Sequence, residues 1–467
     1  MPAPIISVAQ MREWEQLTWD AGRTPMQVIS RVGHTITAWA RQRTRAGDAI
    51  LVLAGKGHNG DDARQVAQIL TDREVNLITI RDPVTGLKEF QAALSLPLAL
   101  IIEGLFGIGL KGNFDAPWSR LIRAINESRV PILSVDVPAG LHADTGEIMG
   151  TAIRATCTLT LGAPKRGLLT AAARPYVGRL ELAPDIGLVP CPHKSPLLWS
   201  LPEDFQGFPP PRPADSHKGD YGHLVIVAGS RGYHGAAVLA AQAALRARPG
   251  LVTLITPEDV YVPVAAQLRA AMVRPWNGKM ELPESCSTVL FGPGLASPAM
   301  PAEMKPQLLE LWRHAAVPVV VDASGLDWLP SGRIASSALR VMTPHPGEAA
   351  RMLSSSTADV QADRPGAATA LSRKFAGAWT VLKGYQTVVG RAKGDMTING
   401  SGNPGLAQGG SGDVLAGFLA GLLAQPGLQT DPSLTLRYAA WQHGVAADRL
   451  AQERKNWTVE DLVVALA

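Results

Sequence analysis

A glycine-rich loop followed by a single carboxylate lies near the C-terminal end of the chain, between Asn403 and Gly417. The loop opens an apolar run that is competent to form a helix. The start of a helix offers free backbone N–H groups and the positive end of the helix dipole to an anion. Asp413 follows Gly412 directly, and a carboxylate there can take a proton from a hydroxyl that is about to be phosphorylated. The alternative interpretation is that Asp413 only caps the helix.

Other residues in the second half of the chain are suited to ligand binding. Gly294 lies in a tight turn after a short apolar run, and Ala236 and Ala237 open a helix of small residues. Small residues admit a flat ligand, although close helix packing would explain them as well. His345 lies between two prolines that present its ring stiffly, which favours ligand contact over core packing. The loop Lys383–Thr387 suits a nucleotide phosphate or ribose, and a solvated hairpin turn is its alternative.

Oxygen-bearing side chains follow three expected strands in the first half of the chain: Asn59, Glu103 and Asp136. Asn59 belongs to a glycine-rich loop, residues 54–62, that is neither a Walker loop nor a GxGxxG dinucleotide loop. This loop is either an anion site or a plain turn with an aspartate cap. Ligands of open α/β sheets collect at the carboxyl ends of the strands. Hard oxygen ligands suit an alkali or alkaline-earth cation, and a carboxylate beside it could move a proton at carbon.

Short apolar runs alternate with helical patterns along most of the chain, which predicts βαβ units and parallel sheets. A proline-rich segment, residues 190–220, interrupts the alternation and is the expected linker. We therefore expect an α/β protein of two domains, residues 1–205 and 206–467. The expected strands are 49–54, 76–80, 98–103, 130–135, 156–161, 223–228, 251–255, 288–291, 317–321, 339–342 and 379–382. The expected helices include 62–71, 116–128, 236–248, 411–424 and 433–450.

Composition narrows the class of protein. The 44 basic and 40 acidic residues are interspersed, with no long basic run, so nucleic-acid binding is not expected. The 3 cysteines are far apart and form no CxxC pair, which indicates a reducing compartment and no structural zinc. Residues 1–16 lack the apolar core of a signal peptide, and the strongly apolar run 414–424 is too short to span a bilayer. We expect a soluble, cytoplasmic protein that forms a homo-oligomer and does not bind membranes.

The three strand ends of the first domain resemble the N-terminal domain of NAD(P)H-hydrate epimerases, a Rossmann-like, three-layer fold that binds potassium. The resemblance implies that Asn59, Glu103 and the carbonyl of Ala139 bind K⁺, and that Asp136 contacts the hydrate or exchanges protons with it. It also implies that the hydrate is lined by His58, Asn59, Gly60, Asp61, Asp62, Gly107, Ile108, Gly109, Leu110, Lys111, Gly112 and Asn113. The chain departs from the family pattern at Gly60–Ala63, Glu103, Ile108 and Ala139.

The second domain resembles the ribokinase-like superfamily and, within it, the ADP-dependent NAD(P)H-hydrate dehydratases. The loops around His345, Lys383 and Asp413 carry this resemblance in the family's order. It implies that Asp413 deprotonates the substrate hydroxyl, that ADP donates a phosphoryl group, and that Mg²⁺ neutralises the nucleotide. The hydrate would contact Ala236, Ala237, Gly294, His345 and Asp413. The nucleotide would contact Lys383, Gly384, Tyr385, Gln386 and Thr387, with the backbone of Gly410, Ser411 and Gly412 as an anion hole.

Taken together, the two resemblances imply a bifunctional repair enzyme. Its first domain would equilibrate the R and S hydrates of NADH or NADPH, and its second would dehydrate the S form, giving AMP and phosphate. The alternative is a ribokinase-like kinase of a vitamin alcohol or sugar, with an N-terminal domain that binds without catalysis.

Overall fold

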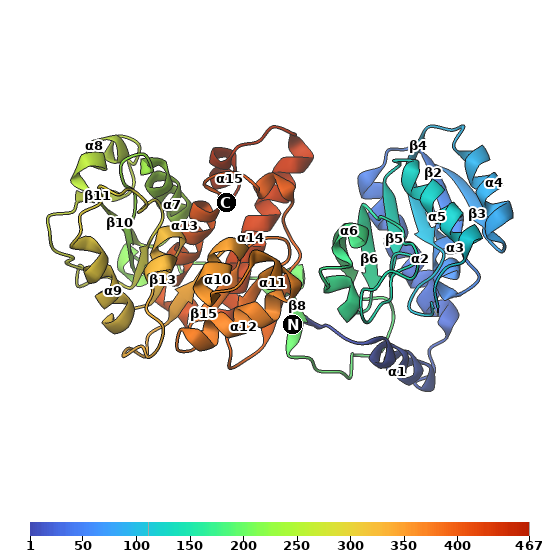
Figure 1. Ribbon diagram of the computed structural model, residues 1–467, viewed down its shortest axis with the longest axis horizontal. Coiled ribbons are helices and arrows are strands. Elements are labelled where there is room, and N and C mark those ends of the chain that lie inside the picture. The colour runs from blue at the N-terminus through green and yellow to red at the C-terminus, as the bar shows by residue number, and fades with distance from the viewer. Residues whose placement is uncertain (111, 467) are drawn as a thin grey trace. The chain divides into compact units, whose positions relative to one another are not determined.

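The computed structural model describes residues 1–110 and 112–466 and divides into two compact units (Figure 1). The N-terminal unit comprises Ala3–Ser195, and the C-terminal unit begins at Pro196 and includes Met1 and Pro2. The expected boundary at residues 205 and 206 lies close to this division. The residues between the two boundaries, 196–205, contain strand β8 (Leu197–Trp199). This strand pairs in parallel with β17 (Met396–Asn399) of the C-terminal unit.

The N-terminal unit is a parallel sheet in the order β3-β2-β4-β5-β6-β7. Its strands are β2 (Ala49–Ala54), β3 (Glu74–Thr79), β4 (Leu98–Gly104), β5 (Ile132–Val135), β6 (Cys157–Leu161) and β7 (Arg179–Ala183). Its helices are α1 (Val8–Asp20), α2 (Pro25–Arg43), α3 (His58–Ile69), α4 (Pro83–Ala93), α5 (Ala116–Glu127), α6 (Arg174–Val177) and the 3₁₀ helix η1 (Arg166–Leu169).

Strand β2 shows why this unit has three layers. All six of its residues are buried, so it reads as a continuous apolar run rather than an alternating one. Ile50 and Val52 pack with residues of α2 and α3, such as Ile36 and Val66. Leu51, on the opposite face, packs with residues of α4 and α5. Helices therefore cover both faces, and the loops at the carboxyl ends of the strands remain free to form a site.

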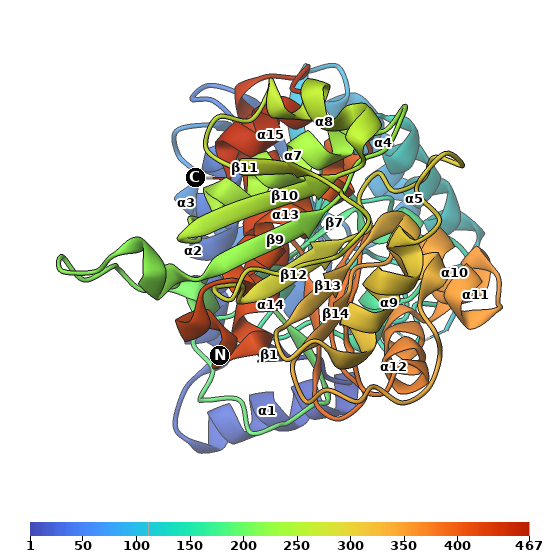
Figure 2. The same ribbon diagram turned by 90° about the vertical axis from the view of Figure 1, so that its left-hand side faces the viewer.

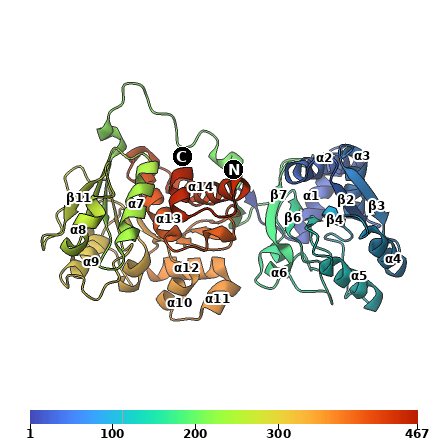
Figure 3. The same ribbon diagram turned by 90° about the horizontal axis from the view of Figure 1, so that it is seen from above.

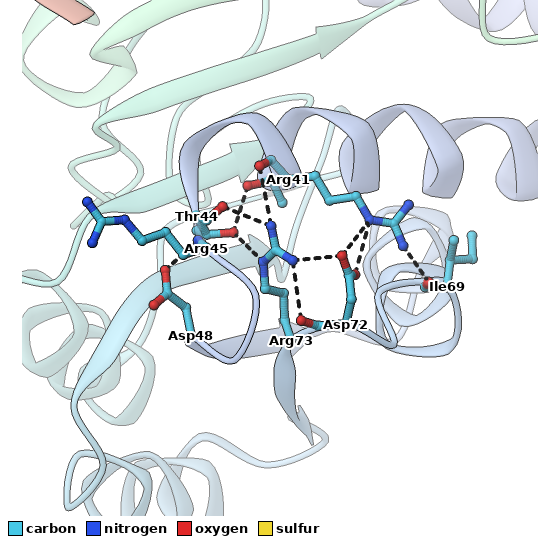
Figure 4. Close-up of polar contacts among 8 residues, drawn as sticks. Arg41, Thr44, Arg45, Asp48, Ile69, Asp72 and Arg73 are labelled. Carbon is cyan, nitrogen blue, oxygen red and sulfur yellow. Dashed lines mark hydrogen bonds and ion pairs between the residues drawn. The ribbon is translucent and has the colours of Figure 1, made fainter. Parts of the chain in front are cut away.

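A polar cluster around Arg73 lies at the opposite end of the strands, where β2 and β3 begin (Figure 4). The Arg73 guanidinium donates to the Thr44 carbonyl at 2.8 Å and to the Asp72 carboxylate at 2.7 Å. Arg41 donates to the same carboxylate at 3.1 Å and to the Ile69 carbonyl at 3.3 Å. Carbonyls at the end of a helix lack partners within the helix. The arginines of this cluster donate hydrogen bonds to such carbonyls at the ends of α2 and α3. The cluster lies away from the loops that follow β2 and β4.

The C-terminal unit is built on a larger mixed sheet in the order β1-β8-β17-β16-β15-β14-β13-β12-β9-β10-β11, in which β1 is the two-residue strand Ala3–Pro4 (Figure 2). Its remaining strands are β9 (His223–Val227), β10 (Leu251–Thr256), β11 (Met272–Pro275), β12 (Thr288–Phe291), β13 (Val319–Val321), β14 (Arg340–Met342), β15 (Trp379–Leu382) and β16 (Thr387–Gly390). Its α-helices are α7 (His234–Arg246), α8 (Glu258–Ala265), α9 (Met304–His314), α10 (Pro346–Leu353), α11 (Thr357–Ala362), α12 (Arg364–Lys374), α13 (Ser411–Leu423), α14 (Pro432–Glu453) and α15 (Val459–Ala465). The 3₁₀ helices are η2 (Pro202–Phe205), η3 (Lys218–Tyr221), η4 (Ala323–Trp328), η5 (Pro404–Leu406) and η6 (Pro426–Gln429).

Helix α13 is anchored by close contact with α7. A Cβ atom added to Gly417 would lie 2.0 Å from the Ala240 carbonyl oxygen, and one added to Gly421 would lie 2.6 Å from that of Ala244. The two glycines therefore let the helix backbones approach. Figure 3 shows α7, α13 and α14 on one side of the sheet and α10, α11 and α12 on the other. The start of α13 is thus held against the carboxyl ends of the central strands.

The predicted fold class, α/β with two domains, is confirmed, and every expected strand is present with shifts of at most a few residues. The expectation missed β1, β7, β8, β11, β16 and β17. These strands are short or lie toward the sheet edges, and β11 is largely exposed, so its apolar signal is weak. Among the residues that the structure describes, no helix is long and apolar enough to cross a membrane.

Candidate active sites

A cavity of about 650 Å³ lies within the N-terminal unit, at the carboxyl ends of β2, β4 and β5. Eight of the expected hydrate contacts line it: His58, Asn59, Asp62, Gly107, Ile108, Gly109, Leu110 and Asp136. Gly60 packs on the backbone of Gly55, and Asp61 pairs with Arg64 at 2.6 Å. Gly112 and Asn113 are exposed and do not line the cavity, and Lys111 lies outside the described residues.

Asn59 and Glu103 provide oxygen donors beside this cavity. Both polar atoms of the Asn59 side chain are buried and make no hydrogen bond to any residue that the structure describes. The Glu103 carboxylate is fully buried and accepts hydrogen bonds from Leu105 N at 2.7 Å and Ser134 Oγ at 2.8 Å. Burial raises the pKa of Glu103 to about 7. The Ala139 carbonyl accepts one hydrogen bond, from Ile153 N at 2.9 Å. This donor set suits an alkali cation, which would favour the ionised carboxylate.

Asp136 is held by a lysine that the sequence interpretation did not identify. Lys165 is fully buried, and its ammonium donates to Asp136 Oδ1 at 2.5 Å and to the Leu161 carbonyl at 2.8 Å. Asp136 also accepts from Leu161 N at 3.1 Å, and its backbone adopts φ of 64°. Non-glycine residues seldom adopt this left-handed conformation, and such strain is concentrated at functional sites. The arrangement presents an anchored carboxylate to the cavity. The only sequence signal for Lys165 was its place shortly after β6.

Two further carboxyl groups line the same cavity, Asp62 at the start of α3 and Glu15 on α1. The pKa of Asp62 is raised well above its ordinary value, first by burial and then by the nearby charge of Asp136. Burial and Asp136 likewise raise the pKa of Glu15. The cavity therefore joins a lysine-paired carboxylate with carboxyl groups that favour protonation, as acid–base chemistry requires. Glu15 was not predicted, because α1 precedes the first strand of the sheet by a long stretch of chain.

In the C-terminal unit, Asp413 lies in the first turn of α13, as expected. Gly410 caps this helix with φ of 93°, a left-handed conformation that suits glycine, and no side chain bonds to the first N–H groups. Ser411 N donates to the Gln408 carbonyl at 3.3 Å, and the N–H groups of Gly412 and Asp413 stay available to an anion. Burial, followed by the charge of Asp322, raises the pKa of Asp413 to about 7. A carboxylate of this basicity can take a proton near neutral pH.

His345 has a structural role that its sequence position did not reveal. Its Nδ1 atom accepts hydrogen bonds from Gly347 N at 3.0 Å and Glu348 N at 3.3 Å, so the ring caps α10. The side chain is about half exposed, and Nε2 lies 3.5 Å from Glu348 Oε1. The cap fixes the ring and leaves its outer edge to a ligand.

The residues of the Lys383–Thr387 loop differ in their surroundings. Lys383 turns inward and donates to Asp322 Oδ1 at 2.5 Å, whereas Tyr385 is exposed. Gln386 is buried with φ of 55°, and the Thr387 hydroxyl donates to the Gly384 carbonyl at 3.1 Å. The loop therefore has a cation that points inward and an aromatic ring that is exposed. Only the exposed ring fits the alternative of a solvated hairpin turn.

Gly294 and Ala236 lie together, since a Cβ atom added to Gly294 would lie 2.9 Å from the Ala236 Cβ. Ala237 differs: it is fully buried, and its Cβ lies against the Gly229 turn. Ala237 therefore supports the turn from within the core. His443 on α14 was missed. Its Nε2 lies 3.1 Å from the Ser411 carbonyl, and burial lowers its pKa to about 4, so a neutral ring braces the start of α13.

The fold and the two sites define a two-domain α/β enzyme whose C-terminal site is built for an anion and a proton acceptor. Residues 224–465 match the family of NAD(P)H-hydrate dehydratases, and residues 82–167 match that of YjeF-related protein N-termini. The chain belongs to the bifunctional NAD(P)H-hydrate repair enzymes.

Relatives and a solved structure support this assignment. The enzyme of Gloeobacter violaceus is 37% identical over 99% of this chain and 96% of its own, and that of Coxiella burnetii is 34% identical over 95% and 94%. The crystal structure of the Bacillus subtilis ADP/ATP-dependent NAD(P)H-hydrate dehydratase, co-crystallized with ATP and Mg²⁺, is 30% identical with a TM-score of 0.50. It covers 55% of this chain and 91% of its own.

Proposed function

We propose that the C-terminal unit dehydrates the S hydrate of NADH or NADPH at the expense of ADP. The observation that carries this proposal is Asp413, whose carboxyl has a pKa of about 7 and lies in the first turn of a helix with free N–H groups. Asp413 takes the proton of the substrate hydroxyl, and the oxygen attacks the terminal phosphorus of ADP. The N–H groups at the start of α13 stabilise charge on the transferred group.

Phosphorylation converts a poor leaving group into a good one. AMP departs with the electron pair of the broken P–O bond. Phosphate then leaves the ring carbon, a proton leaves its neighbour, and the nicotinamide double bond is restored. Mg²⁺ on the nucleotide would neutralise phosphate charge. The described residues contain no group of three metal-ligating acids, histidines or cysteines, and Mg²⁺ in such sites is held largely by the phosphates and water.

We propose that the N-terminal unit interconverts the R and S hydrates, with residues 1–205 and 206–467 as the extents of the two activities. Asp136, fixed by Lys165, exchanges the proton at the hydrate in the 650 Å³ cavity. Asn59, Glu103 and the Ala139 carbonyl would hold K⁺, which would supply electrostatic anchoring for the ligand. The unpartnered amide of Asn59 supports this assignment.

A product assay tests the dehydratase. The full chain is incubated with S hydrate, Mg²⁺ and either ADP or ATP, and the return of NADH absorbance is followed. We expect NADH and AMP with ADP. Phosphorylation of a vitamin alcohol by ATP, without NADH formation, would instead identify a small-molecule kinase.

A second assay tests the epimerase with pure R hydrate, ADP and Mg²⁺, with K⁺ or with tetramethylammonium as the control cation. We expect R hydrate to be consumed faster with K⁺. Failure to consume it under either condition, while S hydrate is still dehydrated, would make the N-terminal unit a binding module.

A further inference from the structure

The buried pair of Lys383 and Asp322 faces the start of α13. Lys383 follows β15, and Asp322 follows β13, so both lie at carboxyl ends of parallel strands that are separated only by β14. A Cβ atom added to Gly412 would lie 3.1 Å from Lys383 Nζ and 3.8 Å from Asp322 Oδ2. The ammonium group is therefore beside the N–H groups that bracket Asp413.

The structure fixes this lysine from several directions. Its ammonium lies 2.5 Å from Asp322 Oδ1, and that oxygen also accepts from Thr343 Oγ1 at 2.7 Å. The Lys383 side chain is 14% exposed and that of Asp322 only 1%, so the pair is shielded while the lysine retains a path to the site. Arg364 donates to the Lys383 carbonyl at 3.0 Å and holds its backbone. A lysine used only for an outer ribose would not need such restraint.

We propose that Lys383 contacts the phosphoryl group while it is transferred from the nucleotide to the substrate. Asp322 is the residue that positions Lys383. This inference rests on the dehydratase function proposed above. As the substrate oxygen bonds to phosphorus and the bond to AMP breaks, negative charge spreads over the three equatorial oxygens. Lys383 faces these oxygens from the sheet, while the α13 N–H groups face them from the helix. Asp322 contacts no reacting atom, and it keeps the ammonium at the position where charge develops.

The same pair sets the basicity of Asp413. Four ionisable groups face Asp413 or its loop: Asp322 from β13, Lys383 from β15, Glu348 from α10 and the neutral His443 from α14. Asp322 and Glu348 raise the pKa of Asp413, and Lys383 lowers it. Removing one charge at a time should therefore shift the acid limb of the rate profile in opposite directions.

The experiment compares Lys383→Met, Lys383→Arg and Asp322→Asn in the full chain, using S hydrate, ADP and Mg²⁺. We expect Lys383→Met to lower kcat by about 10²–10³-fold, as for loss of one donor to a developing charge, with the KM for ADP within about threefold. Lys383→Arg should recover part of kcat. The acid limb should move to higher pH in Lys383→Met and to lower pH in Asp322→Asn. Lys393→Met, at an exposed lysine in the turn between β16 and β17, is the matched control and should behave as wild type.

An unpaired charge in a buried pair can unfold a protein, so the double variant Asp322→Asn/Lys383→Met is included and its fold is checked by circular dichroism. It should be folded and as slow as Lys383→Met. A Lys383→Met or double variant that keeps kcat and only raises the KM for ADP would overturn the proposal and make Lys383 a nucleotide-binding residue. If wild type itself makes no NADH, the dehydratase function fails instead.

Discussion

At the residue scale, both sites contain an ion pair between a lysine and an aspartate, and in each site this pair includes or adjoins the proposed catalytic carboxylate. Lys165 pairs with Asp136, and Lys383 pairs with the neighbour of Asp413. The two carboxylates differ in their contacts, and this difference fits the different roles proposed for them. Asp136 is bonded to its lysine directly, whereas Asp413 has a pKa of about 7 and can cycle between its two states near neutral pH.

Replacement of the base should abolish dehydration. We expect Asp413→Asn to lower kcat by at least 10²-fold, because general-base catalysis usually supplies 10²–10⁴-fold. ADP affinity measured by calorimetry should change little, since the α13 N–H groups remain. Retention of more than about a tenth of the rate would contradict the role of Asp413.

The same substitution should change stability in a pH-dependent way. The pKa of Asp413 is raised from 3.8 to about 7 on folding, so the folded state binds more protons between these values and wild-type stability falls as pH rises through them. Asp413→Asn removes this loss. Its C-terminal unit should therefore gain more thermal stability over wild type at pH 8 than at pH 4. Equal gains at both pH values in thermal melts would contradict the shift.

At the element scale, the α7–α13 contact positions the anion site, and it depends on glycine. Gly417→Ala places a Cβ atom against the Ala240 carbonyl, and we expect a loss of about 1–3 kcal/mol from overpacking. The melting temperature of the C-terminal unit should fall by several degrees, with an increased KM for ADP as α13 shifts.

Gly427→Ala is the matched control, because its Cβ would meet nothing within 4 Å. It should leave both the melting temperature and the KM for ADP near wild type. An equal loss of melting temperature in both variants would contradict the role of the α7–α13 contact.

At the scale of the whole molecule, joining the two activities makes sense when hydrates form as both epimers and only one is dehydrated. With an equal mixture of R and S hydrate, wild type should convert nearly all of it to NADH. Asp136→Asn should stop when the S form is spent, at about half the yield, with its initial rate unchanged. Full conversion at the wild-type pace would remove Asp136 from epimerisation. The cytoplasmic location and homo-oligomeric state remain predictions.

The sequence by itself determined the α/β class, the two-domain order, most central strands and the loops that hold Asn59, Asp136, His345 and Asp413. These follow from local signals, because apolar periodicity and glycine-rich loops are written in consecutive residues. The sequence did not identify Lys165, because the importance of this lysine comes from its contact with Asp136 in the folded chain.

Only the tertiary structure decided how distant groups share a site. The pairing of Asp322 with Lys383 needed β13 and β15 to lie in one sheet, separated only by β14. His345 as a helix cap and Ala237 as a core residue likewise depended on three-dimensional neighbours. Ion pairing, burial and the resulting proton affinities are set by distances through space, which the order of residues along the chain does not contain.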